Sequence, residues 1–191
     1  MTRPYGSIMR GFGLEVDGDL TLVVAEARFA GPFAALVQAN REHLTRFDPW
    51  AVELADVAAA RAMLTAAATR FAAGTEVPTL VVTGGQIVGI VSLRVDVPAR
   101  SGSLGYWLGA AHTGRGLATR AVRALSLLGF DELGLVRVSA QLDVDNAASR
   151  AVVRRAGFTR EGVLRSGALT HGAVGDLEQW SLLPGEAERS A

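Results

Sequence analysis

The sequence predicts an α/β (α+β) fold in which helices flank one central mixed, mostly antiparallel sheet. Three observations predict it. Apolar residues recur at helical spacing in some segments, alternate in others, and several strand-like runs are joined by short glycine-containing turns. Helical and strand-like segments also interleave along the chain. We therefore expect helices packed on a single sheet.

The chain is expected to open the sheet with a hairpin and then to form a first helix. LEVDGDLTLVV, from Leu14, places the turn-forming pair Asp17-Gly18 between apolar residues. Gly31-Pro32 predicts the helix start, because the fixed φ of proline suits the first helical position. The residues expected on one face of this helix are Phe33, Leu36, Val37, Asn40 and Leu44.

A second helix and a three-stranded meander should follow. Val57, Leu64 and Phe71 repeat on one stripe, and Gly74 predicts the helix end. TLVVT and QIVGIVSLRV flank a two-glycine turn, which is typical of antiparallel strands. SLGYWLG is the expected third strand, with Leu104, Tyr106 and Leu108 on one face and Ser103, Gly105 and Trp107 on the other.

The rest of the chain should add a helix, a strand, a short helix and two strands. The long helix closes near Gly134, and its predicted buried stripe is Leu117, Ala121, Leu125 and Leu128. VRVSAQL alternates as a strand, with Val136, Val138, Ala140 and Leu142 on one face. A helix from about Asn146 to Ala156 stops at Gly157, and two strands surround His171-Gly172. Segments 1–12 and 184–191 are expected to be loose ends.

The composition limits the chemistry. A chain of 191 residues corresponds to about one domain, so we expect a single domain over 1–191. The absence of cysteine excludes disulfides, thiolate metal sites and a cysteine nucleophile. All 19 basic residues are arginine, which excludes a Schiff-base lysine and the lysine of a P-loop. No metal site is expected.

Charge and hydropathy favour a cytoplasmic protein without a nucleic-acid or membrane partner. The formal net charge is zero, so no broad electrostatic attraction to nucleic acid or lipid is expected. No apolar run approaches the roughly 18–20 residues of a membrane span. The N-terminal MTRPYGSIMRGFG lacks the apolar stretch of a secretory signal.

The stretch HTGRGLATR, residues 112–120, forms a glycine-rich turn at the start of the long helix. A helix N-terminus leaves its first amides unpaired and stabilises a nearby anion by about 0.3–2 kcal/mol. Gly114 and Gly116 let a ligand approach the backbone closely. A tight strand-to-helix connection without a ligand is the alternative explanation of the two glycines.

Three kinds of phosphate-binding loop resemble this turn. A P-loop requires a lysine, which the chain lacks. A dinucleotide fingerprint requires glycine or alanine where Thr119 stands, within a parallel unit, whereas the preceding strand belongs to an antiparallel meander. The third kind is the pyrophosphate loop of the GNAT acetyltransferases.

The segment from about 102 to 165 resembles the acetyl-CoA-binding core of the GNAT family. It is most similar to the branch of ribosomal-protein N-terminal acetyltransferases of the RimJ and RimL type. The matching residues are Gly105-Tyr106-Trp107, Gly114-Arg115-Gly116, Asn146, Ser149, Gly157-Phe158 and Glu161-Gly162. NREHLTRFDPW, residues 40–50, is similar to the first helix and loop of that branch. Thr113 departs from the usual glutamine or arginine, and a small effect is expected because the loop binds through backbone amides.

The resemblance implies the GNAT acyl-CoA N-acyltransferase fold and acetyl-CoA as co-substrate. In the family, two strands splay apart around the pantetheine arm, and here these are 103–109 and 135–142. The amides of 111–118 are then expected to hold the diphosphate, while Arg115 and Arg120 either add charge or are solvated helix residues. The implied cofactor-binding residues are Leu108, Gly109, Thr113, Gly114, Arg115, Gly116, Leu117, Ala118, Thr119, Asn146 and Ser149.

The resemblance also indicates how the leaving thiolate is protonated. Many GNAT enzymes use a tyrosine on the last core helix, where this chain has Val153. Ser149, one turn earlier, shares a face with Asn146, and a serine can hydrogen-bond the sulfur and pass on a proton through water. We expect Ser149 to be the thiolate partner and general acid, and Asn146 to orient the cofactor. Helix capping is the alternative role of both residues.

The residues that would bind the amine acceptor are less clearly indicated by the sequence, and no general base is identified. His43 lies in the segment that usually lines the acceptor cleft, but it is expected to be structural. The aromatic residues Trp50, Tyr106 and Trp107 either wall the amine site or belong to the core. The residues expected to bind substrate are Glu42, Asp48, Trp50, Ser103 and Trp107.

The predicted activity is acetyl transfer from acetyl-CoA to a primary amine, either a protein N-terminus or a small molecule. The alternative is a non-catalytic acyl-CoA sensor or scaffold, because Ser103 and Val153 stand where some relatives carry catalytic residues. A dinucleotide oxidoreductase is a third hypothesis. The sequence does not name the acceptor, and it leaves open a homodimer through the C-terminal strands or helices.

Overall fold

The computed structural model describes residues 13–47, 49–170 and 173–187. The strands of this part of the chain are β1 (Gly13–Asp17), β2 (Leu20–Val24), β3 (Glu76–Thr83), β4 (Gln86–Asp96), β5 (Ser101–Leu108), β6 (Arg137–Asp143), β7 (Thr159–Thr170) and β8 (Ala173–Leu182). They form one sheet in the order β1-β2-β3-β4-β5-β6-β8-β7. Neighbouring strands pair antiparallel except β5 and β6, which pair parallel. The predicted mixed, mostly antiparallel sheet is confirmed.

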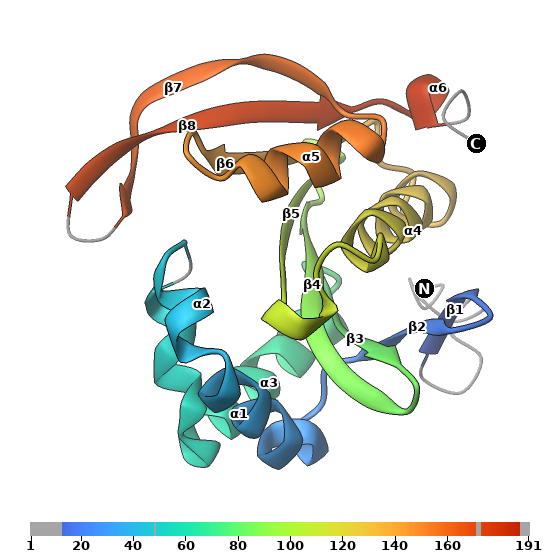
Figure 1. Cartoon of the computed structure of the whole chain (residues 1–191). Helices are drawn as coiled ribbons and strands as arrows, with labels where there is room; N and C mark the ends of the chain where they lie inside the picture. The colour runs from blue at the N-terminus through green and yellow to red at the C-terminus, as the bar shows by residue number, and fades with distance from the viewer. Residues whose placement is uncertain (1–12, 48, 171–172, 188–191) are drawn as a thin grey trace.

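The helices cover both faces of the sheet (Figure 1). They are α1 (Ala30–Ala39), α2 (Arg41–Thr45), α3 (Val57–Ala72), α4 (Leu117–Asp131), α5 (Ala147–Arg155) and α6 (Pro184–Ala187), with 3-10 turns η2 (Ala27–Phe29), η3 (Pro49–Ala55) and η4 (Ala110–His112). α1, α2 and α3 lie together on one side, and α4 and α5 lie on the other. None of the described helices is long and apolar enough to cross a membrane.

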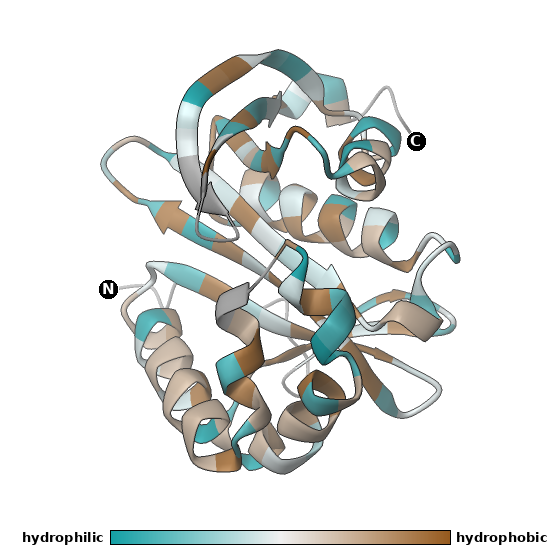
Figure 2. Ribbon diagram, turned by 60° about the vertical axis from the view of Figure 1, so that its left-hand side comes forward, coloured by the Kyte–Doolittle hydropathy of each residue, from teal (hydrophilic) through white to brown (hydrophobic). Residues whose placement is uncertain are grey.

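Alternating side chains place a separate hydrophobic cluster on each face of the sheet. Leu104 and Leu108 of β5 pack with Leu125 of α4 on one face. Trp107, between them in sequence, packs with α1 on the other face, where its ring centroid lies 5.7 Å from that of Phe33. Figure 2 shows brown, apolar segments on the central strands and teal, polar ones in outer turns. The alternation predicted for SLGYWLG is therefore confirmed.

Two N-terminal expectations need correction. Pro32 is the third residue of α1 rather than the first, because η2 runs directly into a helix that begins at Ala30. Proline is tolerated there because the first four amides of a helix have no intrahelical acceptor. Val57, expected in the buried stripe of α3, is 46% exposed in the first turn, and the small side chains of Ala60 and Ala67 join Leu64 in the buried stripe instead.

Two further corrections concern the second half of the chain. Val136 is 48% exposed because β6 begins one residue later, at Arg137. The expected loose end at 184–191 is partly ordered: Pro184–Ala187 form α6, and Ala187 is buried in the same cluster as α4. The turn expected at His171-Gly172 lies outside the described residues.

Candidate functional site

The sheet is split at its centre, because β5 and β6 pair over only part of their length. The pairs run from Ser101 opposite Arg137 to Leu104 opposite Ala140. Beyond Leu104, β5 stays paired with β4 on its other side, and β6 stays paired with β8. The facing backbone edges of the two strands therefore diverge without a strand partner, as the family resemblance implied.

A cavity of about 290 Å³ lies at this split. Its walls come from α2 and Phe47, from the end of β5 with the turn into α4, and from α5. The lining residues are His43, Leu44, Phe47, Tyr106, Trp107, Leu108, His112, Thr113, Gly114, Gly116, Leu117, Ala118, Thr119, Asn146, Ala148, Ser149, Ala151, Val152 and Arg155. Nine of the eleven predicted cofactor-binding residues are among them; Gly109 and Arg115 are not.

The glycine-rich turn presents a row of backbone amides at the mouth of the cavity. Among the hydrogen bonds of the described residues, no amide from Gly114 to Thr119 is a donor. The first amide that bonds within α4 is that of Arg120, which donates to the Gly116 carbonyl at 3.0 Å. An anion placed there meets several donors and the positive end of a 15-residue helix.

The predicted range of these amides was wrong at its N-terminal end. The His112 and Thr113 amides donate to the carbonyls of Gly109 and Ala110, at 2.9 and 3.2 Å, because η4 turns there. The continuous run of amides without an acceptor among the described residues is therefore 114–119. Gly114 and Gly116 have φ angles of 73° and 75°, a left-handed conformation that favours glycine and turns the amides outward.

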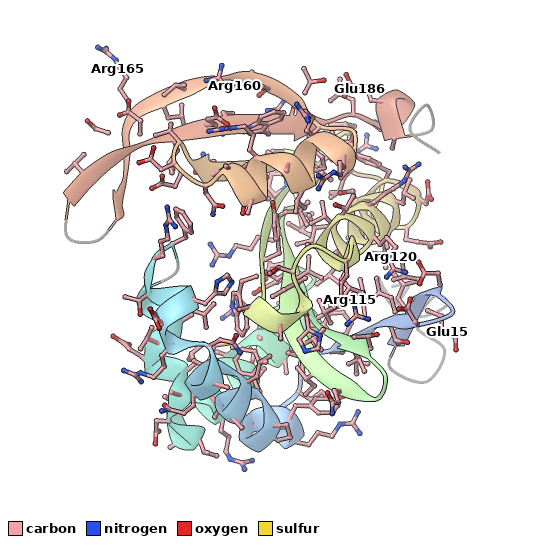
Figure 3. The ribbon with its side chains drawn as sticks, viewed as in Figure 1. Glu15, Arg115, Arg120, Arg160, Arg165 and Glu186 are labelled. Atoms are coloured by element: carbon pink, nitrogen blue, oxygen red, sulfur yellow. The ribbon has the colours of Figure 1, made fainter. Side chains whose placement is uncertain are left out.

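The two arginines of the turn differ in their partners. The Arg120 guanidinium donates to the carboxylates of Asp17, the last residue of β1, and Asp19, in the turn that follows, at 2.6 and 2.8 Å. This hydrogen bonding raises the pKa of Arg120 and lowers that of Asp19. Arg115 is exposed on the turn itself (Figure 3). Since the charge of Arg120 is directed to Asp17 and Asp19, Arg115 is the better placed of the two arginines to attract an anion at the amides.

The start of α5 brings both predicted catalytic residues to the cavity. The Asn146 Oδ1 accepts a hydrogen bond from the Ser149 amide at 3.0 Å, so Asn146 caps the helix as well as lining the cavity. Val153, at the place of the family tyrosine, is fully buried in the core. Tyr106 reaches across from β5, and its hydroxyl donates to the Ser149 carbonyl at 3.2 Å.

A buried carboxylate holds α5 against the sheet. Glu178 of β8, 7% exposed, accepts hydrogen bonds of 3.0 Å from Arg150, Arg160 and the Trp180 indole. Burial alone would raise the pKa of Glu178, but the donors from Arg150 and Trp180 outweigh it and lower that pKa. Since Arg150 also donates to the Val144 carbonyl at 2.5 Å, this network fixes the segment that carries Asn146 and Ser149.

The acceptor-side residues are only partly brought together. Trp107 lines the cavity, and His43, expected to be structural, is exposed and lines it too. Glu42 lines an adjoining hollow that shares His43, whereas Ser103 is exposed on β5 and does not line the cavity. Asp48 and the side chain of Trp50 lie outside the described residues.

Several lining residues were missed that helical spacing could have found. Val152 and Arg155 continue the three-residue spacing of Asn146 and Ser149, and Ala148 lies four residues before Val152, so they share one face of α5. Phe47 and His112 carry no such signal. Within the described residues, no group of three or more His, Asp or Glu side chains is arranged to hold a metal ion.

This geometry agrees with the comparison to known families. A profile of the acetyltransferase (GNAT) domain matches residues 20–159, which is most of the chain. The chain belongs to the GNAT acetyltransferase family. The GNAT profile begins at β2 and ends at the first residue of β7, so it includes the split between β5 and β6, the amide turn and α5.

Individual relatives of this GNAT chain share its fold. YdaF of Bacillus subtilis (strain 168), described as a ribosomal N-acetyltransferase, is 37% identical over 105 residues, which cover 54% of this chain and 57% of YdaF. The chain thus spans little more than half the length of the curated relatives it matches. The microcin C7 self immunity acetyltransferase MccE, solved with acetyl-CoA and AMP, has a TM-score of 0.87 at 24% identity, covering 92% of this chain and 98% of MccE. RimJ of Mycobacterium smegmatis, solved with CoA-disulfide, has a TM-score of 0.82 at 25% identity, covering 90% of this chain and 87% of RimJ.

Proposed function

We propose that this protein transfers the acetyl group of acetyl-CoA to a primary amine. The observation that carries the proposal is the row of amides at 114–119, which opens onto the split between β5 and β6 in a chain of the GNAT family. A diphosphate at the turn would accept hydrogen bonds from these amides. The pantetheine arm would enter the split and pair with the open strand edges. MccE, of the same fold, was solved with acetyl-CoA.

The acceptor is proposed to be the N-terminal amine of a protein, and a small amine is the alternative. The name of YdaF, a ribosomal N-acetyltransferase, supports the protein N-terminus. The acceptor would enter beside α2, where His43, Phe47 and Trp107 line the cavity and Glu42 lines the adjoining hollow. Asp48, Trp50 and Ser103 keep their predicted acceptor roles as proposals.

The residues on α5 are proposed to act at the thioester. The amine nitrogen attacks the thioester carbonyl carbon, the new C–N bond forms, and the C–S bond breaks to release a thiolate. The Ser149 hydroxyl would hydrogen-bond that sulfur and relay the proton it takes up, while Asn146 would orient the cofactor. Turnover requires that the thioester and the amine be held together, and the cavity between α2 and α5 would hold them.

A non-catalytic acyl-CoA sensor is the second candidate function. The observation that favours it is Val153, a fully buried valine without a transferable proton at the family tyrosine position. We propose for both functions a single domain over 1–191 that is located in the cytoplasm. Any homodimer is proposed to form through the C-terminal strands or helices. Sedimentation at several protein concentrations would detect the dimer.

The release of free coenzyme A thiol distinguishes the two functions. The purified protein would be mixed with acetyl-CoA and a panel of amines: peptides copying ribosomal-protein N-termini, the same peptides with blocked N-termini, polyamines and amino acids. The proposal expects thiol release that depends on a free N-terminal amine, together with a peptide mass gain of one acetyl group. Acetyl-CoA binding without thiol release for any amine would support the sensor.

A further inference from the structure

A phenol from β5 lines the cavity beside the start of α5. Tyr106 lies on β5, two residues beyond the last residue that pairs with β6, and its side chain lines the cavity at the split. It is half-buried and lines the cavity together with Asn146, Ser149 and Val152. Its hydroxyl donates to the Ser149 carbonyl at 3.2 Å, although the two residues are 43 positions apart in sequence.

We infer that the Tyr106 hydroxyl supplies the proton to the departing coenzyme A thiolate, an inference that rests on the proposed acetyl transfer. The phenol stands one helical turn from the place of Val153, on the cavity side of the same helix. It thus occupies, from β5, the region in which a proton donor is needed. Ser149 retains its hydrogen bond to the sulfur and relays protons.

The acidity of the groups decides between Tyr106 and Ser149 as the proton source. A thiol of the cysteine type has a pKa of about 8.5 and a tyrosine phenol about 10, so their affinities for a proton are close. An aliphatic hydroxyl and bulk water both have pKa values far above that of a phenol, so they give up a proton much less readily. Proton transfer to a thiolate is therefore far easier from a phenol than from serine or water.

The step balances without any further reactant. As the C–S bond breaks, its electron pair stays on sulfur, and the Tyr106 O–H gives its proton to that sulfur. The tyrosinate then recovers a proton, through water or the Ser149 hydroxyl, from the nitrogen that has become bonded to the acetyl group. The products are the acetylated amine and the free thiol, and Tyr106 is again neutral.

The other titratable side chains that line the cavity with Tyr106 are two histidines and an arginine. His43 of α2, His112 of η4 and Arg155 of α5 line the same cavity among the described residues, and Val91 of β4 lies opposite Tyr106 in the sheet. Histidines in general titrate at about 6.5 and arginines above about 12. A loss of activity on the alkaline side is therefore a signature of the phenol, whereas one on the acid side belongs to a histidine or to the amine.

The test is the pH dependence of kcat in Tyr106→Phe, which removes only the hydroxyl. We expect kcat to fall by about 10²–10⁴-fold, the usual contribution of a general acid, with the alkaline loss of activity abolished. Acetyl-CoA affinity, measured by calorimetry, should change less than about threefold, because the diphosphate contacts are backbone amides. Ser126→Ala, which removes a hydroxyl that donates to Val122 inside α4, is the control and should leave kcat unchanged.

A second variant keeps the inference testable if Tyr106→Phe does not fold. The chain has two tyrosines, so in a Tyr5→Phe background Tyr106 is the single one. Biosynthetic replacement of this tyrosine by a fluorinated tyrosine of lower pKa should move the alkaline limb of kcat to lower pH. A structural role would leave that limb in place.

The outcomes separate this inference from the proposed function. Unchanged kcat and an unchanged alkaline limb in Tyr106→Phe, with normal wild-type turnover, would overturn the role of Tyr106 and leave acetyl transfer intact. Weaker acetyl-CoA binding with unchanged kcat would make Tyr106 a binding residue, which also overturns it. A wild-type protein that releases no thiol with any amine would refute both.

Discussion

At the scale of single residues, the site depends on two left-handed glycines. A Cβ at Gly114 or Gly116 would meet no heavy atom within 4 Å, so neither glycine is required by crowding. Their φ angles of 73° and 75° are the reason for glycine, because a side chain in this region is strained. The residue type could therefore be predicted from the sequence, whereas the amides that the turn frees could be identified only from the hydrogen bonds of η4.

Gly116→Ala should weaken both the fold and the anion site. Gly116 is the N-cap of α4, and a left-handed alanine costs about 1–2 kcal/mol in free energy of unfolding. Relief of that strain would also turn the amides away from the diphosphate. We expect coenzyme A affinity to fall by about tenfold or more, measured by calorimetry. Gly18→Ala, in the turn after β1 with open space around it, is the matched control; equal affinity losses in both variants would contradict the role of the turn.

Ser149→Ala should lower turnover more than acetyl-CoA affinity. The hydroxyl is proposed to contact the sulfur only as charge develops there, so its loss acts on the transition state. The cap from Asn146 to the backbone of residue 149 survives the substitution, because the amide and not the hydroxyl is bonded. Rates of thiol release and calorimetric affinities measured on the same preparation would check this. A normal rate in Ser149→Ala would remove the serine from the mechanism.

At the scale of elements, a carboxylate ties three strands together at the end of β6 that pairs with β5. Glu161 of β7 accepts hydrogen bonds from both terminal nitrogens of Arg137 on β6, one of them at 2.7 Å, and from Ser181 on β8 at 2.8 Å. These donors lower the pKa of Glu161 to about 2, with Arg137 the larger cause. Glu161 therefore favours folding only when it is ionised.

Glu161→Gln should reduce stability in a pH-dependent way. The folded-state pKa of Glu161 lies below that of the unfolded chain, so its contribution is complete above about pH 5 and is lost as the pH falls through about 2. The Glu161 side chain is 38% exposed, so solvent screening limits the difference in unfolding free energy to about 1 kcal/mol at pH 7. Urea unfolding of both proteins at pH 7, 5 and 3 would measure it. A difference that stays constant down to pH 3 would contradict the assignment.

Strand pairing and helix identity could be predicted because each has a local signal. Alternation marked β5 and β6, and the Gly84-Gly85 turn marked the β3–β4 hairpin. The ends of elements were less predictable: Val57 and Val136 fit their periodic patterns but stand where a helix or strand begins, and burial there depends on distant packing. The family resemblance implied the α4 and α5 sides of the cavity and placed the segment of His43 at the acceptor cleft, while Leu44 and Phe47 in the same wall required the tertiary structure.

At the scale of the whole molecule, cofactor binding should raise the melting temperature. A ligand that binds only the folded state at 100 times its Kd stabilises it by about 2.7 kcal/mol, which corresponds to roughly 5–10 °C for a chain of this size. Acetyl-CoA should produce this shift in a thermal melt, and Gly116→Ala should reduce it. NADH should not raise the melting temperature, because the turn has Thr119 where a dinucleotide site requires glycine or alanine. A shift with NADH and none with acetyl-CoA would instead favour the oxidoreductase hypothesis.

The split between β5 and β6 has a consequence for handling the protein. Open strand edges are templates for pairing with other chains, and here two such edges face each other inside one sheet. Coenzyme A bound between the two edges would cover them and prevent such pairing. Protein freed of coenzyme A should therefore aggregate sooner during storage than protein that has coenzyme A bound. Light scattering followed over several days would measure this difference.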